Sequence, residues 1–136
     1  MKVLSLFDGI SCGMLALQRA GIPVECYDAF EIDKYAVTVS KRNFPVIVHH
    51  GNVYDGDFTQ FKGYDLLLGG SPCTYWSIAK KDREVDCNGE GFRLFKEYVR
   101  ALEESGCKYF LYENNYSVHQ RIKDEISKTL GVEPIM

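Results

Sequence analysis

The fold is indicated first by a stretch near the N-terminus that reads Val3-Leu4-Ser5-Leu6-Phe7-Asp8-Gly9-Ile10-Ser11-Cys12-Gly13. It begins with a short apolar run typical of a strand, and Asp8-Gly9 ends that run in a glycine-containing turn. Ser11 can then cap a helix that closes at Gly21, with Pro23 beyond it. The stretch therefore predicts a strand, a turn and a helix in succession.

The same alternation continues along the chain. Further strands are expected at residues 24–30, 46–48, 64–68 and 109–112, and further helices at 33–44, 92–105 and from 118 to about 131. Residues 80–91 are charged and glycine-containing without periodicity, which predicts a mobile surface loop. Alternating strands and helices predict an α/β fold with a doubly wound, mainly parallel sheet, whose ligands bind at the carboxyl ends of the strands. No linker divides the sequence, so we expect one domain over residues 1–136.

Composition places the chain among ordinary globular proteins, with 46% hydrophobic and 26% charged residues. No apolar run approaches the roughly 20 residues that span a bilayer, and Met1-Lys2 leads directly into a strand, so we expect a cytoplasmic protein without membrane contact. The cysteine count, five, is odd and includes no C-x-x-C pair, which argues against a disulfide framework or a metal site. The net charge of -3 indicates that any contacts with DNA phosphates come from another segment or chain.

The first turn has the features of a nucleotide-type ligand site. Its glycines allow a ligand to approach the backbone, and Glu31 follows about 20 residues later at the end of the next expected strand, the spacing of an acid that binds ribose hydroxyls. A structural turn with a solvated Glu31 is the alternative. A dinucleotide site fits less well because the glycine spacing is not G-x-G-x-x-G.

Two reactive side chains follow later strands. Ser71-Pro72-Cys73 leaves the fourth strand, and the proline fixes the direction of a thiol that can act as a nucleophile; the alternative is a buried packing cysteine. Glu113 leaves the fifth strand, where it is either the N-terminal acid of the following helix or a carboxyl aimed at the same crevice as Cys73. Neighbouring strands would bring both side chains to one substrate.

The ordered set of motifs resembles the N-terminal part of the cytosine-5 DNA methyltransferase family over nearly the whole chain. Phe7-Asp8-Gly9 with Gly13 resembles the family's first methyl-donor motif, and Glu31-Ile32-Asp33 its second. Pro72-Cys73 falls where the family has its nucleophile, and Glu113-Asn114 where it has its Glu-Asn-Val motif. The resemblance implies a Rossmann-like fold that binds S-adenosylmethionine and releases S-adenosylhomocysteine.

The resemblance also implies residue roles. Cys73 would attack C6 of a flipped cytosine while Glu113 stabilises the charge at N3, and C5 would then accept the methyl group. Phe7 and Ile32 would flank the adenosine, Glu31 would hold the ribose, and Asn114 would brace the Pro72-Cys73 loop. The whole implied donor site comprises Phe7, Asp8, Gly9, Ser11, Gly13, Glu31, Ile32, Asn52, Val53, Pro72 and Leu94.

Three departures from the family pattern bear on this hypothesis. Thr74 follows Pro72-Cys73 where the family usually has Gln, Asn115 replaces the Val after Glu113-Asn114, and Asn52 stands where an Asp tends to receive the adenine amino group. An amide carbonyl can still accept that hydrogen bond, without the charge.

The sequence also ends before the family's Gln-x-Arg-x-Arg segment and target-recognition region, so the predicted methyltransferase fold is incomplete at its C-terminal end. We therefore expect DNA contacts from a missing segment or a second chain, and either self-association or a completing polypeptide over the open sheet.

Alternative functions remain at this point. One is a catalytically idle module that binds the donor or a protein partner, which the departures and the early end favour. The retention of both Cys73 and Glu113 favours the enzyme. A nucleotide-binding oxidoreductase would need a dinucleotide fingerprint and a hydride-transfer site, and neither is found.

Overall fold

A five-stranded parallel sheet forms the centre of the computed structural model, which describes residues 1–136. The strand order is β3-β2-β1-β4-β5, and every neighbouring pair is parallel. The strands are β1 (Lys2–Leu6), β2 (Cys26–Phe30), β3 (Val48–His50), β4 (Leu66–Gly69) and β5 (Tyr109–Tyr112). This is the doubly wound α/β sheet that the alternating sequence pattern predicts.

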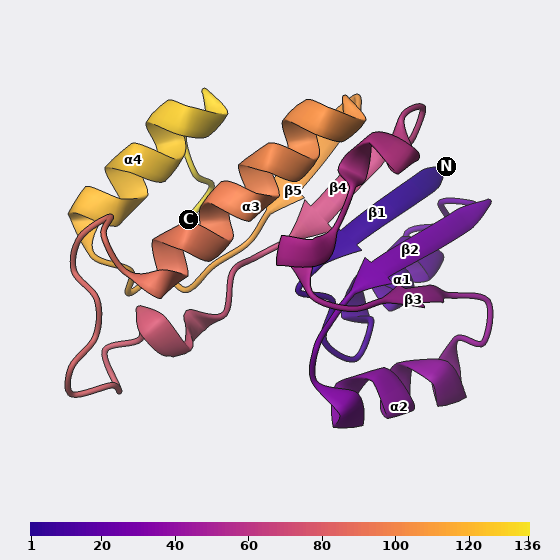
Figure 1. Ribbon diagram of the computed structural model, residues 1–136, viewed down its shortest axis with the longest axis horizontal. Helices are drawn as coiled ribbons and strands as arrows, with labels where there is room; N and C mark the ends of the chain where they lie inside the picture. The colour runs from indigo at the N-terminus through magenta and orange to yellow at the C-terminus, as the bar shows by residue number, and fades with distance from the viewer.

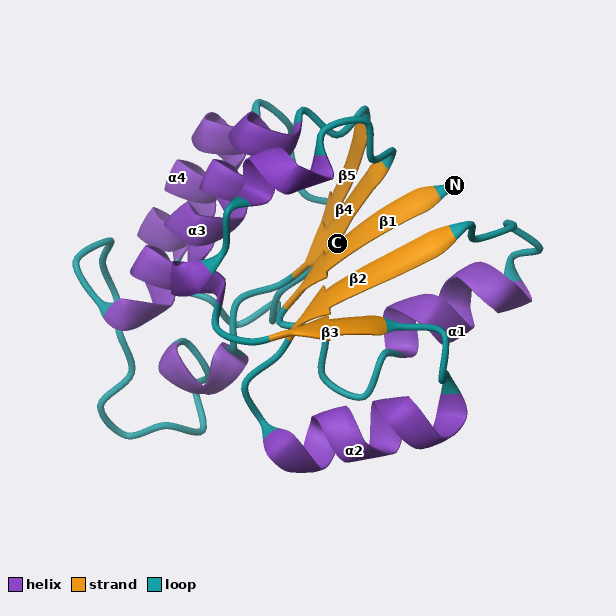
Figure 2. Cartoon of the chain, turned by 45° about the vertical axis from the view of Figure 1, so that its right-hand side comes forward, coloured by secondary structure: helices purple, strands orange, loops and turns teal.

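Helices cover both faces of the sheet. Figure 2 shows α1 (Cys12–Arg19) and α2 (Lys34–Asn43) on one side, and α3 (Glu90–Ser105) and α4 (Gln120–Leu130) on the other. Short 3₁₀ helices lie at Val53–Asp55, Phe58–Phe61 and Cys73–Tyr75. The strand order reverses on the two sides of β1, so the carboxyl ends of β1 and β4 flank the switch point where ligands bind in such sheets.

Alternation along the strands divides the core into two layers. Leu4, Leu6 and Phe30 pack with α3 and with the two 3₁₀ helices of residues 53–61, called the 3₁₀ segment below. Val3 and Ala29 pack with α1 on the opposite face. Successive side chains of a strand point to opposite faces, and a strand covered on both faces reads as a continuous apolar run. A third cluster, at the junction of α3 and α4, surrounds the fully buried Trp76.

The 3₁₀ segment is tied to α3 by Arg100. Its guanidinium donates to the carbonyl oxygens of Val53 at 2.9 Å and Gly56 at 2.8 Å, and it lies 4.4 Å from the centre of the Phe58 ring. Two acids of the same helix, Glu97 and Glu104, hold the guanidinium from the other side. This arrangement fixes the loop that follows β3 at the rim of the sheet.

The edge strand β5 leaves apolar side chains uncovered on the face that α1 and α2 cover elsewhere. Tyr109 is 51% exposed and Leu111 is 62% exposed, although both belong to a strand. Figures 1 and 2 show α1 and α2 beside β2 and β3, away from β5. The exposure predicted for an open sheet is therefore present at this edge.

Several local expectations need correction. The strand expected at residues 46–48 begins at Val48 and ends at His50, because the parallel register with β2 pairs Asp28, Ala29 and Phe30 with Val48, His49 and His50. The 3₁₀ helices within residues 53–61 lie in a segment read as a polar loop. Asp33 caps α2 as expected, accepting from the amides of Tyr35 and Ala36.

Ser11 precedes α1 as predicted but does not cap it with its side chain. Its φ is 70°, and its hydroxyl instead donates to Asp8.

No helix in the structure combines the length and apolar character that a bilayer crossing requires.

Candidate active site

The residues singled out in the sequence gather along one edge of the sheet. The turns after β1, β2, β4 and β5 contain Asp8, Glu31, Cys73 and Glu113, and parallel strands bring all of these turns to the same edge. Figure 2 shows the strand arrowheads pointing together toward the loops at this edge. A crevice outside the carboxyl ends is the usual ligand site of this architecture.

The first turn is held from inside by the carboxylate of Asp8. Ser5 donates to it at 2.7 Å and Tyr27 at 2.6 Å, and the Ser11 hydroxyl makes a third hydrogen bond. Burial, together with the nearby Asp8 charge, raises the pKa of Tyr27, so its hydroxyl stays protonated and donates. Asp8 therefore fixes the path of the turn with its side chain.

A buried polar chain continues from this turn into the protein. The hydroxyls of Ser11 and Ser40, both fully buried, lie 2.5 Å apart, and Ser40 reaches His49 Nε2 at 3.4 Å. Burial lowers the pKa of His49, and Lys41 adds to the effect, which favours the neutral ring. Helix α2 and strand β3 are thus coupled to the turn through side chains.

Glu31 connects the first two turns. Its Oε1 accepts from the Gly9 amide at 2.8 Å, and its Oε2 accepts from the amides of Ile32 and Asp33, each at 2.9 Å. A carboxylate offers about four acceptor positions, so one remains for a further donor such as a hydroxyl. Glu31 is therefore not the solvated acid that the alternative supposed, whereas a purely structural turn stays the alternative to ribose binding.

The apolar residues predicted for the donor site differ in their exposure. Ile32 is 73% exposed, Phe7 and Leu94 are half-buried, and Val53 is buried. An isoleucine that follows a fixed acid and stays open to solvent suits contact with an apolar ligand face. Asn52 accepts from the Tyr54 amide at 3.0 Å and caps the 3₁₀ turn, so one lone pair of its carbonyl is already used.

Two glycines of the set have different physical roles. Gly9 has a φ of 61°, so the turn itself requires it. A Cβ at Gly13 would lie 3.0 Å from both the Leu68 side chain and the Tyr27 hydroxyl. Gly13 therefore allows α1 to pack closely on the sheet.

Cys73 lies at the mouth of the sheet as the first residue of a 3₁₀ turn, and its side chain is exposed. Its carbonyl accepts from the amides of Trp76 and Ser77 at 3.0 and 2.9 Å. Because Trp76 is fully buried, the turn is anchored while the thiol points outward. The alternative of a buried packing cysteine at position 73 is wrong.

The Glu113 loop lies directly against the Cys73 loop. The Glu113 amide donates to Gly69 at 2.9 Å, and a Cβ built on Gly70 would stand only 1.9 Å from the Glu113 carbonyl oxygen. No side chain other than hydrogen fits at position 70. The Glu113 carboxylate is exposed and accepts no hydrogen bond within the chain, and it does not cap α4, which His119 precedes.

Asn114 lies where the predicted bracing role requires it. Its amide donates to the Ser71 carbonyl at 3.0 Å and to the Tyr112 hydroxyl at 3.3 Å, and the Ser71 and Tyr112 hydroxyls lie 2.5 Å apart. Burial raises the pKa of Tyr112, which keeps this hydroxyl neutral. The loops carrying Cys73 and Glu113 are therefore joined by side chains as well as by backbone.

Several residues of the site have no distinct sequence signal. Tyr27, Ser40 and Tyr112 lie inside regular elements, where apolar or mixed periodicity describes them as core or surface. Tyr54, whose hydroxyl donates to Glu90 at 2.7 Å, lies next to the Asn52-Val53 pair and could have been suspected from that position. Burial and the Glu90 bond raise the pKa of Tyr54 to about 12.

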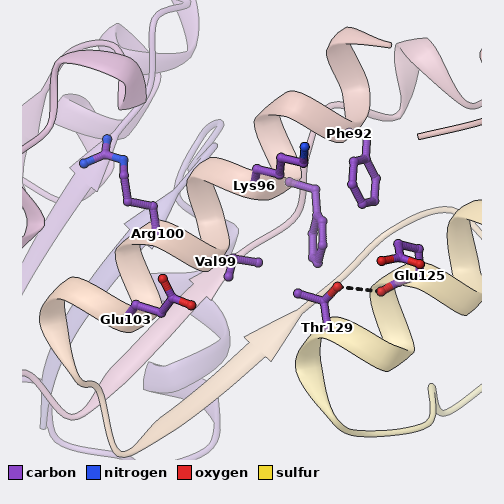
Figure 3. A pocket seen from close by; sticks show the side chains of 8 residues that line it. Phe92, Lys96, Val99, Arg100, Glu103, Glu125 and Thr129 are labelled. Carbon is purple, nitrogen blue, oxygen red and sulfur yellow. Dashed lines mark hydrogen bonds between the residues drawn. The ribbon is translucent and has the colours of Figure 1, made fainter. Parts of the chain in front are cut away.

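A groove of about 200 Å³ lies away from this edge, between α3 and α4. Figure 3 shows a floor of aromatic and aliphatic groups with charged side chains around it, and a hydrogen bond within α4 from Thr129 to Glu125. The lining residues are Phe92, Phe95, Lys96, Val99, Arg100, Glu103, Glu125 and Thr129. None of the residues predicted for the donor or for catalysis contributes to this groove.

Comparison with known proteins identifies the family. The model of the C-5 cytosine-specific DNA methylase family matches residues 1–130, and the chain belongs to this family. It is 38% identical to the orphan methyltransferase M.SPRI of Bacillus phage SPR over 97% of this chain and 29% of that protein. It is 34% identical to the type II methyltransferase M.HgiCII of Herpetosiphon aurantiacus over 83% of this chain and 25% of that protein.

Solved structures show the same fold. A Spodoptera frugiperda DNMT2 mutant superimposes with a TM-score of 0.74 at 23% identity, over 96% of this chain and 40% of that chain. The Dnmt2 methyltransferase of S. pombe gives a TM-score of 0.65 at 16% identity, over 96% and 39% of the two chains. The Rossmann-like methyltransferase fold is thus established, and the chain spans about a quarter of the length of the curated relatives named above.

Proposed function

We propose that this chain is the donor-binding and catalytic part of a DNA (cytosine-5) methyltransferase that transfers a methyl group from S-adenosylmethionine to C5 of a flipped cytosine. The observation that supports this most strongly is the junction of two loops. Cys73, with an exposed thiol, and Glu113, with a carboxylate that accepts no hydrogen bond, lie in the loops that follow the neighbouring strands β4 and β5. The backbones of these two loops are in contact at Gly70. A nucleophile and an acid at the ends of adjacent strands suit attack on one ring and stabilisation of the charge that attack produces.

In the proposed reaction, the Cys73 thiolate attacks C6 of the cytosine while Glu113 hydrogen-bonds or protonates N3. The C5–C6 electron pair would become available at C5, which would bond to the methyl group as the sulfur–methyl bond of the donor breaks and S-adenosylhomocysteine leaves. The C5 proton would then pass to solvent, and the electrons of the C5–H bond would restore the C5–C6 double bond as Cys73 leaves C6 as a thiolate. Any proton that N3 took from Glu113 would return to it. Because the base must leave the duplex to reach Cys73, base flipping accompanies the step.

The donor is proposed to bind at the turns that follow β1 and β2, next to Glu31. S-adenosylmethionine supplies an electrophilic methyl group when bound. Glu31 would accept a ribose hydroxyl with its remaining lone pair, and Phe7 and Ile32 would contact the adenine faces. The Asn52-Val53 pair and Leu94 would close the adenine side. Gly9 and Ser11 would border the methionine part through the turn backbone, with Pro72 at its other edge and with Asp8 and Gly13 shaping the turn.

The DNA contacts are proposed to come from outside residues 1–136. The net charge of -3 does not favour binding to a polyanion. The exposed Tyr109 and Leu111 on edge strand β5 support association with a completing polypeptide, or self-association, along that side of the sheet. Type II methyltransferases of Herpetosiphon aurantiacus among the relatives make a restriction-modification setting the working hypothesis.

Replacing Cys73 tests this function. In a preparation of this chain that methylates DNA, Cys73→Ser is expected to reduce methyl transfer to cytosine-containing DNA by at least about 10³-fold, since a serine hydroxyl is a far weaker nucleophile. Donor affinity should stay unchanged. Cys87→Ser, which removes a thiol from a neighbouring loop, is the matched control.

Unchanged transfer by Cys73→Ser would remove Cys73 from the mechanism. Donor binding without transfer by the unmodified protein would favour the idle binding module.

A further inference from the structure

One acidic residue, Glu84, connects the loop that follows Cys73 to the start of α3. Glu84 lies in the segment between the Cys73–Tyr75 turn and α3, and its side chain points back to the start of that helix. Its Oε1 accepts from the Glu90 amide at 2.9 Å, and its Oε2 accepts from the Gly91 amide at 3.0 Å. The Glu84 amide in turn donates to the Tyr75 carbonyl at 2.8 Å, two residues after Cys73.

The start of α3 is shaped for this carboxylate. Gly89, the residue before the helix, provides no side-chain cap of its own, so Glu84 satisfies two of the free amides instead. A Cβ at Gly89 would lie 2.1 Å from the Glu84 carboxyl carbon, and one at Gly91 would lie 2.9 Å from Glu84 Oε2. Both positions therefore accept the acid only because they are glycine. A negative charge is also stabilised at a helix N-terminus.

The residue before Glu84 makes a contact with the other reacting loop. Arg83 donates to the Ser117 carbonyl at 2.7 Å, and Ser117 lies in the segment that continues from Glu113. The indole of Trp76 fills the space between these contacts, packed with Phe92 of α3 and with Val118. The segment after Cys73 is thereby fixed both to α3 and to the segment after Glu113.

We propose that Glu84, assisted by Arg83, is a positioning residue that holds the Cys73 loop and the Glu113 loop in their reactive arrangement. This inference rests on the proposed function, because it concerns the same pair of reacting groups. Glu84 touches neither substrate nor donor and acts through the backbone of Tyr75 and of α3. Its effect should fall on the chemical step and leave donor binding unchanged.

Amide exchange and thiol labelling of the isolated chain test the physical part without any need for activity. In Glu84→Ala, exchange at the Glu90 and Gly91 amides should accelerate roughly tenfold or more, because two charge-assisted hydrogen bonds are lost. Alkylation of Cys87, whose pKa burial raises and which lies in the same loop, should accelerate relative to the exposed Cys12. Glu84→Gln keeps one acceptor and should recover part of the protection.

Asp82→Asn is the matched control, because this exposed acid lies two residues away and makes no hydrogen bond within the chain. It should exchange and react like the unmodified protein. Equal exchange in Glu84→Ala and Asp82→Asn would show that Glu84 does not hold the loop and would overturn the proposal.

The effect of Glu84 on the reaction rate is tested with a preparation of this chain that methylates DNA. Glu84→Ala should lower kcat by about tenfold to a hundredfold with the KM for the donor unchanged, as expected when loop geometry alone is disturbed. Partial rescue of kcat by Glu84→Gln would support the positioning role. A normal kcat in Glu84→Ala would contradict it, whereas an inactive unmodified enzyme would instead contradict the proposed function.

Discussion

The turns of the proposed donor site and those of the proposed catalytic pair differ in how their acids are used. In the proposed donor site, the carboxylates of Asp8 and Glu31 are already engaged, with three hydrogen bonds each to the chain's own hydroxyls or amides. In the proposed catalytic pair, Cys73 and Glu113 are exposed and the Glu113 carboxylate has no partner in the chain, although the Glu113 backbone is hydrogen-bonded to the end of β4.

The difference indicates two ways of preparing a site. The donor turn contains residues at positive φ, Phe7, Gly9 and Ser11, and needs internal bonds to hold that strained path. The proposed reacting side chains of Cys73 and Glu113 must instead stay available to the substrate. The protein therefore fixes their backbone and leaves the two side chains without hydrogen-bond partners. The contrast can be tested by disturbing each side separately.

The largest effect is expected from Gly70→Ala. The new Cβ would stand 1.9 Å from the Glu113 carbonyl oxygen, so one of the two loops must move. Overpacking typically costs about 1–3 kcal/mol, and a backbone clash this close should reach the upper end of that range or exceed it. We expect a lower melting temperature in calorimetry and near-complete loss of methyl transfer. Gly51→Ala is the control, because its Cβ meets nothing within 4 Å; similar stability of the two variants would show that the contact is not rigid.

A smaller effect is expected from Asp8→Asn on the donor side. The amide has one acceptor oxygen where the carboxylate has two. At least one of the hydroxyls of Ser5, Ser11 and Tyr27 therefore loses the oxygen to which it donates. Such a loss costs about 1–3 kcal/mol, and we expect donor affinity to fall roughly tenfold as the turn loosens. Titration calorimetry and chemical denaturation measure the two quantities. Unaltered donor affinity would mean that the turn holds its path without Asp8.

The smallest effect concerns pH. The pKa of His49 is lowered in the folded protein by burial first and by Lys41 second. The folded state therefore favours the neutral ring. The stabilisation is present above the unfolded pKa of about 6.5 and is lost as pH falls through the lower folded value. Because His49 contacts Ser40 beneath the first turn, donor affinity should fall over the same range. The His49→Gln variant should lose this pH dependence, and an unchanged profile would show that His49 is not its source.

Much of the fold follows from the order of apolar runs and turn residues. The parallel sheet, the carboxyl ends of β2 and β5, and the Asp33 cap of α2 were predictable because each depends on a local pattern. The bounds of β3 were not, because a three-residue strand takes its register from β2. The Ser11 side chain also departed from expectation, since a distant Tyr27 and Ser40 complete the network that occupies it.

The candidate site divides in the same way. Glu31, Cys73 and Glu113 were found because each follows a strand, and strand ends meet at one edge. Tyr112 and Glu84 were not found, because their roles depend on partners in segments far away in the chain or folded back on it. Residues 80–91 were predicted to form a mobile surface loop, yet Arg83 and Glu84 make defined contacts there, and the last two residues of the range already belong to α3.

The most direct measurement is calorimetric titration of the purified chain with S-adenosylmethionine and with S-adenosylhomocysteine, in parallel with Glu31→Ala. The account predicts binding of one equivalent by the unmodified chain and a clear loss of affinity in Glu31→Ala, which removes both the proposed ribose acceptor and the bond to Gly9. No binding by the unmodified chain, or equal binding by the variant, would contradict a donor site at the first turn.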